Sequence, residues 1–253
     1  MKKLITFFST LVIVSMIFGS LNVSADSSDE EVVLFEEEQI TDIDALIERA
    51  KNGITDIPVN ESNRSIVSLE SNKSIANTQS LTQSTESDEF VVKEQYETTQ
   101  KIKAVKKGNE ITETFSNTSI AIMAQGQKYQ TKPDSSEGVV AYSTVTYDTV
   151  TKNNLDTYKI IKVSGGWNRH DPTINMTDRK YRFGVTGNSF EGGTAVSWNS
   201  GTIETSLNAF QQNAPTSWGY VVDDSIMAAG VTSTITLSRG TSSKWELKLT
   251  NNL

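Results

Sequence analysis

The stretch EGVVAYSTVTYDTVTKNNLDTYKIIKV, residues 137–163, decides the fold class of this chain. Its first half is dense in β-branched and aromatic residues, which pack well on a pleated sheet and favour strands. The polar run TKNNLD at residues 151–156 interrupts this pattern, and TYKIIKV at residues 157–163 resumes it. Two β-forming runs joined by a short polar connection predict an antiparallel hairpin.

Similar patterns lie on both sides of this hairpin. In KIKAVKKGNEITETF, residues 101–115, apolar and polar side chains alternate before and after a Lys-Gly-Asn turn. The closing pair, VTSTITL at residues 231–237 and KWELKLT at residues 244–250, carries two matching apolar faces. One segment, TSLNAFQQNAP at residues 205–215, favours a helix that its proline would end. Residues 90–253 therefore predict an all-β domain, an antiparallel β-sandwich or open barrel of about eight to ten short strands.

Residues 26–89 differ from this domain in charge and composition. They hold 16 Asp and Glu against 4 Lys and Arg, whereas the residues after 89 hold 15 and 17. Only residues 41–52 show a helical pattern, with Thr41 as the cap. The rest is rich in Ser, Asn, Thr, Gln and Glu, and buries too little apolar surface to offset the entropy of ordering. The sequence predicts an acidic, largely disordered segment with one short helix, which serves as a linker or a pro-region.

The first 25 residues have the three parts of a secretory signal peptide. A basic start, MKK at residues 1–3, precedes an apolar run at residues 4–18, and VSA at residues 23–25 supplies small residues for cleavage. The alternative is an uncleaved membrane anchor, which the shortness of the apolar run disfavours. The chain has no cysteine, which excludes a lipoprotein anchor and disulfides. We expect residues 1–25 to be removed and a chain beginning near Asp26 to be secreted and extracellular.

The decapeptide SGGWNRHDPT, residues 164–173, gathers several chemically active side chains. His170 has the chemistry of a general base, with Asp171 or Asp178 as its partner. No nucleophile accompanies it, and adjacent residues on an extended strand point to opposite faces. The favoured interpretation is a strand connection, in which Gly-Gly bends the chain and Asp-Pro starts a turn.

Metal and cofactor sites have little support in the sequence. With one histidine and no cysteine, only oxygen ligands remain, and these suit calcium. Asp223-Asp224 and the pair Asp171 and Asp178 are the candidate carboxylates, but no calcium-loop motif surrounds them. We predict no metal, no cofactor and no catalytic residues, and a protein that is not an enzyme.

The late aromatic residues are more informative about binding. Exposed aromatic rings stack on sugars or anchor protein interfaces. Trp245 alternates with Leu247 and Leu249 and is predicted to lie in the core. The predicted ligand-binding residues are Trp167, Trp198, Trp218 and Tyr220. For these residues the alternative is packing in an ordinary sandwich core.

Three functions remain open at this point. The favoured one is a secreted, non-enzymatic β-sandwich protein with a binding or structural role at the cell surface or in the extracellular matrix. Its partner would be a cell-wall glycan or an extracellular protein. The alternative is a proprotein whose acidic segment masks a toxin-like or bacteriocin-like effector domain, and a hydrolase is the least supported. Nucleic acid is not an expected partner, because neither part of the chain clusters lysine and arginine. No membrane is expected as a partner after signal cleavage, and the oligomeric state stays open.

Overall fold

The computed structural model describes residues 30–57, 66–71, 89–126, 138–240 and 243–253. The described residues are mostly antiparallel β-structure, so the predicted all-β fold class is confirmed. No helix in these ranges is both long enough and apolar enough to cross a membrane. The predicted signal peptide at residues 1–25 lies outside the described residues, and so does much of the predicted linker.

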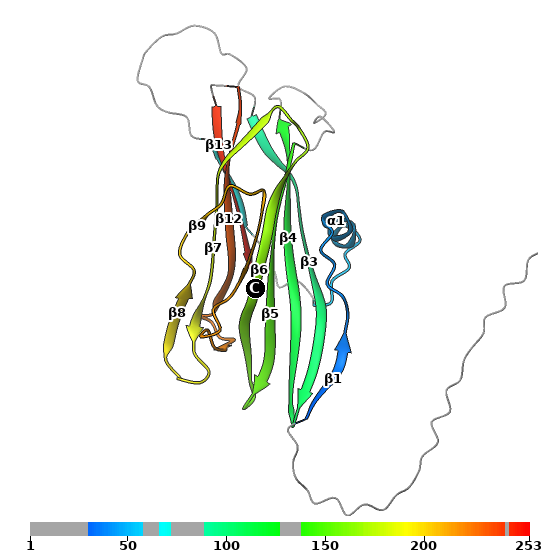
Figure 1. Cartoon of the computed structure of the whole chain (residues 1–253), viewed down its shortest axis with the longest axis vertical. Coiled ribbons are helices and arrows are strands. Elements are labelled where there is room, and N and C mark those ends of the chain that lie inside the picture. The colour runs from blue at the N-terminus through cyan, green and yellow to red at the C-terminus, as the bar shows by residue number, and fades with distance from the viewer. Residues whose placement is uncertain (1–29, 58–65, 72–88, 127–137, 241–242) are drawn as a thin grey trace, which may run out of the picture.

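Two antiparallel sheets face each other, and the larger one curls (Figure 1). In spatial order the larger sheet contains β1 (Glu31–Glu36), β3 (Glu89–Lys107), β4 (Glu110–Gly126), β5 (Val139–Lys152), β6 (Leu155–Arg169) and β10 (Ala209–Asn213), with β11 (Val221–Val222) also beside β6. The smaller sheet contains β2 (Ile66–Ser71), β13 (Ser243–Asn252), β12 (Ala228–Arg239), β7 (Ile174–Asn188) and β8 (Ala195–Asn199), with β9 (Ile203–Glu204) beside β7. The four long strands β3–β6 are consecutive in the chain and lie side by side.

Both hairpins predicted among these long strands are present. Gly108 lies in the turn between β3 and β4 and has a φ of 61°. Asn153 and Asn154 join β5 to β6, with φ values of 52° and 62°. Glycine and asparagine tolerate this left-handed conformation, which two-residue hairpin turns require.

The hydrophobic core lies between the sheets, where alternate residues of each strand point inward. Trp167 on β6 is 1% exposed, and its ring centroid lies 5.6 Å from that of Phe210 on β10. Trp245 on β13 packs edge-on against Phe90, with 4.7 Å between ring centroids. The predicted core position of Trp245 is confirmed.

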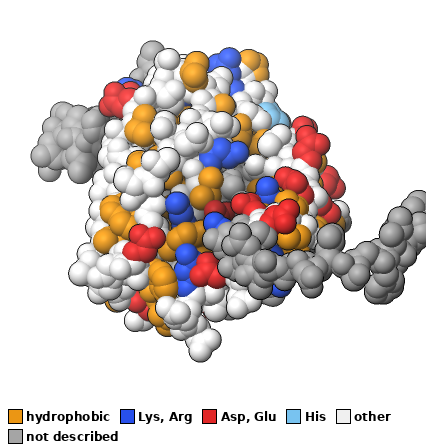
Figure 2. Space-filling view, turned by 60° about the horizontal axis from the view of Figure 1, so that its bottom comes forward, with side chains coloured by type: hydrophobic (Ala, Val, Ile, Leu, Met, Phe, Trp, Pro, Cys, Tyr) orange, Lys and Arg blue, Asp and Glu red, His pale blue; other side chains and the backbone are white. Residues whose placement is uncertain are grey.

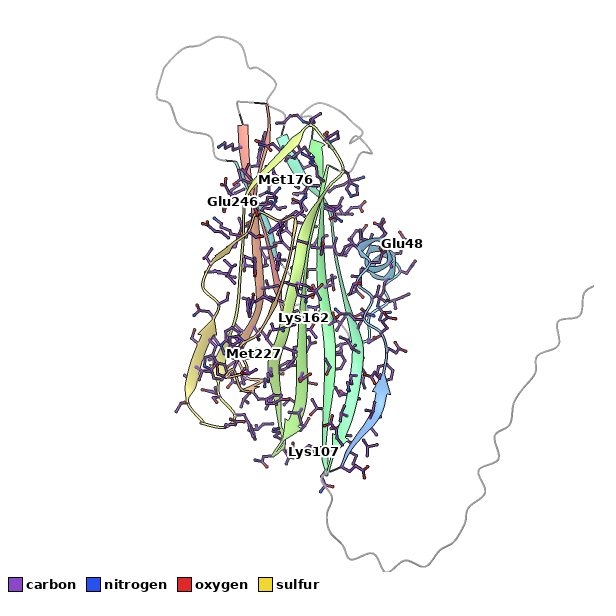
Figure 3. All side chains as sticks on the ribbon, viewed as in Figure 1. Glu48, Lys107, Lys162, Met176, Met227 and Glu246 are labelled. Atoms are coloured by element: carbon purple, nitrogen blue, oxygen red, sulfur yellow. The ribbon has the colours of Figure 1, made fainter. Side chains whose placement is uncertain are left out.

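The strands of the two sheets differ in length, and this difference shapes the lower end of the molecule. β3 has 19 residues and β4 has 17, whereas β13 has 10. In Figure 1 the C-terminal end of β13 lies at mid-height of the larger sheet, and Figure 3 shows Lys107 at the lower tip of the β3–β4 hairpin. The inner face of the larger sheet therefore continues below β13. We call this lower part the overhang, residues 101–115 and 147–159.

The predicted N-terminal helix is present as α1 (Ile43–Lys51). Its N-cap is Asp42, whose Oδ1 accepts a hydrogen bond from the Ala45 N–H at 2.9 Å, and not Thr41 as predicted. The helix lies against the outer face of the larger sheet, where Leu46 and Ile47 are buried. The partner that its apolar stripe required is thus the β-domain of the same chain.

The acidic N-terminal segment contains two strands that the sequence did not predict. β1 pairs with β3 and places Glu31 opposite Lys107, while Glu36 lies 3.7 Å from the Lys103 ammonium group. β2 pairs with β13 and forms an edge of the smaller sheet. The description of this segment as largely disordered was therefore wrong for both strands. The missing information was the partner strand, because lysines far along the chain offset the acidic charge of β1.

A second correction concerns residues 205–215, which favoured a helix. Ala209–Asn213 instead forms β10, which pairs with β6 in an antiparallel register. Phe210 lies opposite Gly165, and a Cβ atom on Gly165 would be 2.6 Å from the Phe210 Cζ atom. Tertiary packing of this ring against a glycine decides the conformation, and it overrides the weak local preference.

Candidate ligand-binding site

An open pocket of about 700 Å³ lies on the inner face of the overhang, and we call it the end pocket. Figure 2 turns this end toward the viewer and shows acidic, basic and hydrophobic side chains interspersed. The side chains that give the end pocket its chemical character are Asp56, Lys101, Glu113, Phe115, Asp156 and Tyr158. Its volume is in the range of small-molecule binding sites, which bury a few sugar rings or a comparable ligand.

Strand register explains why these side chains meet. Residues that lie opposite each other in an antiparallel sheet share a face. Ala104 is opposite Glu113, Glu113 is opposite Thr149, and Thr149 is opposite Tyr158. This row crosses four strands, and its members belong to the inward-facing set that continues upward into the core. A carboxylate, a hydroxyl and an aromatic ring, each half-buried, therefore stand side by side on this face of the sheet.

Ion pairing and hydrogen bonds fix the polar wall of the end pocket. The Lys101 ammonium nitrogen lies 2.5 Å from the Glu113 Oε1 atom. Asp56 Oδ2 accepts a hydrogen bond from the Lys101 backbone N–H at 2.8 Å, and its Oδ1 accepts one from Arg49 at 2.7 Å. Asp156 Oδ1 accepts a hydrogen bond from the Thr151 hydroxyl at 2.6 Å. The wall is ordered before any ligand arrives, which lowers the entropic cost of binding.

Aromatic rings run from the core to this wall. Phe115 stacks on Tyr147 with 5.8 Å between centroids, and Tyr147 lies 5.8 Å from Tyr158. Burial raises the pKa of the Tyr158 hydroxyl above its usual range, and the charges of Asp223 and Asp156 raise it further. Tyr158 therefore keeps its proton at neutral pH. It offers a ligand both a ring face and a hydroxyl group.

The charge of the end pocket limits what it can hold. Asp56, Glu113 and Asp156 supply three carboxylates, while Lys101 is the one basic side chain in the lining. Phosphate, carboxylate and nucleic acid ligands would meet unfavourable charge there. A neutral ligand rich in hydroxyl groups, or one that carries an amine, would find acceptors and aromatic faces.

Two of the predicted binding residues, Trp167 and Trp218, are buried. Trp167 is 1% exposed and Trp218 is 6% exposed, with its ring centroid 5.4 Å from that of Phe183. Both side chains therefore pack in the core, which was the alternative for them, and their binding of a ligand stays a prediction. The reason for the burial of Trp167 is that Gly165 and its neighbouring glycine do not bend the chain. They lie within β6 and leave room for aromatic rings above the strand.

Trp198 and Tyr220 are half-buried and remain accessible in part. Trp198 lies on β8 opposite the buried Val185, and it packs against the edge of the core. The Tyr220 ring lies 4.8 Å from the Lys152 ammonium group and 5.6 Å from that of Lys159. Burial, with the nearby charge of Asp148, raises the pKa of Tyr220 to about 12. Of the four predicted residues, two are thus buried and two are half-buried, and their role in binding stays a prediction.

The decapeptide at residues 164–173 is strand and turn. Asp171 Oδ1 accepts hydrogen bonds from the Thr173 N–H at 2.8 Å and from its hydroxyl at 2.7 Å, and Asp171 also pairs with Arg239. The Thr173 hydroxyl, followed by Arg239, lowers the pKa of Asp171. The predicted turn at Asp-Pro is therefore present. His170 is exposed beside this turn, and its backbone N–H donates to the Gly138 carbonyl.

The carboxylates considered for calcium serve local structure. Asp224 Oδ2 accepts a hydrogen bond from Asn188 at 2.7 Å, and its Oδ1 accepts one from the Ile226 N–H. Asp178 lies within β7 with a φ of 50°. Over the described ranges, no group of three or more His, Cys, Asp or Glu side chains is placed to hold a metal ion.

Sequence reasoning missed the residues of the end pocket. The alternation in residues 101–115 indicated which side chains share a face, but it did not indicate that this part of the face continues below the end of β13. Comparisons with protein-family models, curated proteins and solved structures find no match for this chain, so the site is argued from its geometry.

Proposed function

We propose that this protein is a secreted, non-enzymatic β-sandwich module that binds a glycan at the cell surface or in the extracellular matrix. The ligand is neutral or carries amino groups, and it binds in the end pocket. The observation that carries this proposal is the row of Glu113, Thr149 and Tyr158 on the open inner face of the overhang.

The chemistry of sugars fits this arrangement. A pyranose ring has an apolar face of C–H groups, which packs on an aromatic ring such as that of Tyr158. Its edge carries hydroxyl groups, and these donate hydrogen bonds to carboxylates such as Glu113 and Asp156. The three carboxylates also favour an amino sugar. Its ammonium group would form an ion pair with Glu113 in place of the one that Lys101 makes.

Titration of the secreted protein with defined oligosaccharides tests the proposal. N-acetylated and deacetylated glucosamine oligomers serve as the neutral and cationic probes. We expect Tyr158→Ala to weaken binding of both about five- to thirtyfold, since one stacking contact of an aromatic ring contributes on the order of 1–2 kcal/mol. The control is Leu207→Ala, because Leu207 is 68% exposed and does not line the end pocket. Equal affinity in the wild type and Tyr158→Ala would refute the proposal.

One observation favours the second candidate function, that of a proprotein. The N-terminal segment covers the outer face of the larger sheet, where Leu46 and Ile47 pack on Ile120, Ile122 and Val140. Gln39 donates a hydrogen bond to the Ser116 hydroxyl at 2.8 Å on the same face. A hydroxyl group that is buried without a hydrogen-bond partner loses its hydration at a cost in free energy. Such groups are therefore unusual on a face that stays permanently covered by another segment.

Several hydroxyl groups lie under this cover. Thr118 and Thr144 hydrogen-bond to each other at 2.9 Å, whereas the buried Thr146 hydroxyl has no hydrogen-bond partner. Removal of the N-terminal segment would expose this mixed face for an effector function. N-terminal sequencing of the secreted species distinguishes the two candidates. A start near Asp26 supports the binding module, and a start near Phe90 supports the proprotein.

A further inference from the structure

A second open groove, of about 520 Å³, lies on the outer face of the smaller sheet. It spans β7, β8, β12 and β13, and we call it the sheet groove. The buried side chains of Phe183, Val185 and Val231 point into the core. The residues between them, such as Gly184, therefore face away from the core and line the groove. This site is separate from the end pocket, because the two have no lining residue in common.

Two glycines that face each other form the floor of the sheet groove. Gly184 and Gly230 are opposite each other in the register of β7 and β12. A Cβ atom on Gly184 would lie 2.6 Å from the Trp198 carbonyl oxygen, and one on Gly230 would clash with the Asn251 carbonyl oxygen. No side chain fits at either position, so the floor stays at the level of the backbone. A ligand can approach closely there.

The walls of the sheet groove carry hydroxyl and amide groups. The six polar wall residues are Thr186, Asn199, Thr202, Thr232, Thr250 and Asn252. The Thr232 and Thr250 hydroxyl groups lie 3.2 Å apart. The Asn199 Oδ1 atom accepts a hydrogen bond from the Gly201 N–H at 3.1 Å, which orients its amide NH2 group. Such walls suit a hydroxylated chain lying along the sheet.

Charge then selects the ligand class. No aspartate or glutamate lines the sheet groove, and Arg182 is its one charged residue. Arg182 is exposed and has no acidic partner among the described residues. Its strand neighbour Lys180, in contrast, pairs with Glu246 at 3.7 Å. Figure 3 shows Glu246 well above Met227, which directly precedes the groove residue Ala228. The Arg182 guanidinium can therefore accept a ligand carboxylate in bidentate geometry.

We propose that the sheet groove binds a strand of anionic polysaccharide, with its hydroxyl groups on the threonine walls and its acidic group on Arg182. The end pocket then selects neutral or amino-bearing glycans, and the sheet groove selects anionic ones. The net charge of the chain is −8, which disfavours nonspecific uptake of a polyanion. Any measured binding of a polyanion must therefore come from a local site.

Binding of polygalacturonate to the full secreted protein at low salt tests this proposal. We expect Arg182→Gln to weaken binding at least about tenfold and to reduce its salt dependence. The matched control is Lys180→Gln, on the same strand but outside the groove, which should leave binding unchanged. Asn199→Ala should weaken binding about threefold without a change in salt dependence.

The outcomes separate this proposal from that of the end pocket. Tyr158→Ala should leave polygalacturonate binding intact, and Arg182→Gln should leave the glucosamine oligomers bound as before. Equal losses in Arg182→Gln and Lys180→Gln would overturn the proposal, because general charge would then explain binding. Absence of any binding to polygalacturonate would overturn it as well. A polyol phosphate polymer, used as a second polyanion, distinguishes phosphate from carboxylate as the preferred acidic group.

Discussion

The inner face of the larger sheet has an upper and a lower half. Both are formed by the same strands with the same alternation of inward and outward side chains, but they differ in what lies against them. In the upper half, Trp167 and Val163 are fully buried in the hydrophobic core. In the lower half, Glu113, Thr149 and Tyr158 occupy equivalent inward positions and border an open pocket. The comparison shows that the same strands form a core where both sheets pack together and border an open pocket below the end of β13.

The largest expected effect comes from the covered half. Trp167→Ala removes a fully buried ring from contact with Phe210, and we expect a loss of about 3–5 kcal/mol in unfolding free energy. Urea denaturation measures this loss. A change below about 1 kcal/mol would mean that this half is not a packed core.

The boundary between the two halves contains a buried polar contact. The Asn251 amide donates to the backbone carbonyls of Asn117 at 3.0 Å and of Ser143 at 2.8 Å. Asn251→Ala leaves these carbonyls buried without a partner, so we expect a loss of about 1–3 kcal/mol. Lys248→Ala, at an exposed position on β13, is the control and should cost little. Similar values for both variants would show that the end of β13 is not held by this contact.

A smaller effect is expected at alkaline pH from Tyr220, which packs with lysines of the overhang. Its pKa of about 12 lies above the value near 10 of an unfolded tyrosine. A raised pKa favours the protonated folded state. This stability is present below pH 10 and is lost as pH rises through 12.

Tyr220→Phe tests this effect, because phenylalanine has no titrating group. Between pH 9 and 11 the wild type should lose more unfolding free energy than the variant. Since Tyr220 is only half-buried, we expect the difference to stay below about 1 kcal/mol. Parallel pH profiles in urea denaturation would show that Tyr220 does not contribute.

The smallest effect on stability is expected from Glu113→Gln in the end pocket. The Lys101–Glu113 pair is about one-third exposed, so its loss should cost at most about 1 kcal/mol. The variant keeps the shape of the pocket but lowers its negative charge. Deacetylated glucosamine oligomers should therefore lose more affinity than acetylated ones, as isothermal titration would measure. A loss of several kcal/mol in stability would assign Glu113 to the fold and not to binding.

Much of the fold was predictable because its signals are local. The turns at Gly108 and at Asn153-Asn154 carry residues suited to positive φ, and alternation in the closing pair of strands predicted the buried face of Trp245. The N-terminal helix was predictable from its apolar spacing, although its N-cap is Asp42, one residue after the predicted Thr41.

The rest depends on contacts between distant parts of the chain. β1 requires the lysines of β3, and β10 requires the space above Gly165. The exposure of an aromatic residue depends on how far the opposing sheet extends, which alternation does not encode. For that reason the buried Trp167 and Trp218 were named as candidate binding residues, while Tyr158 was not considered.

Chemical-shift mapping of the labelled secreted protein with an N-acetylated glucosamine oligomer tests the central claim most directly. The claim is that the overhang of the larger sheet is the ligand-binding surface. We expect saturable shifts confined to residues 101–115 and 147–159, with Glu113 and Tyr158 among the largest. Saturable shifts that fall elsewhere and spare these two ranges, or the absence of saturable shifts, would contradict the account.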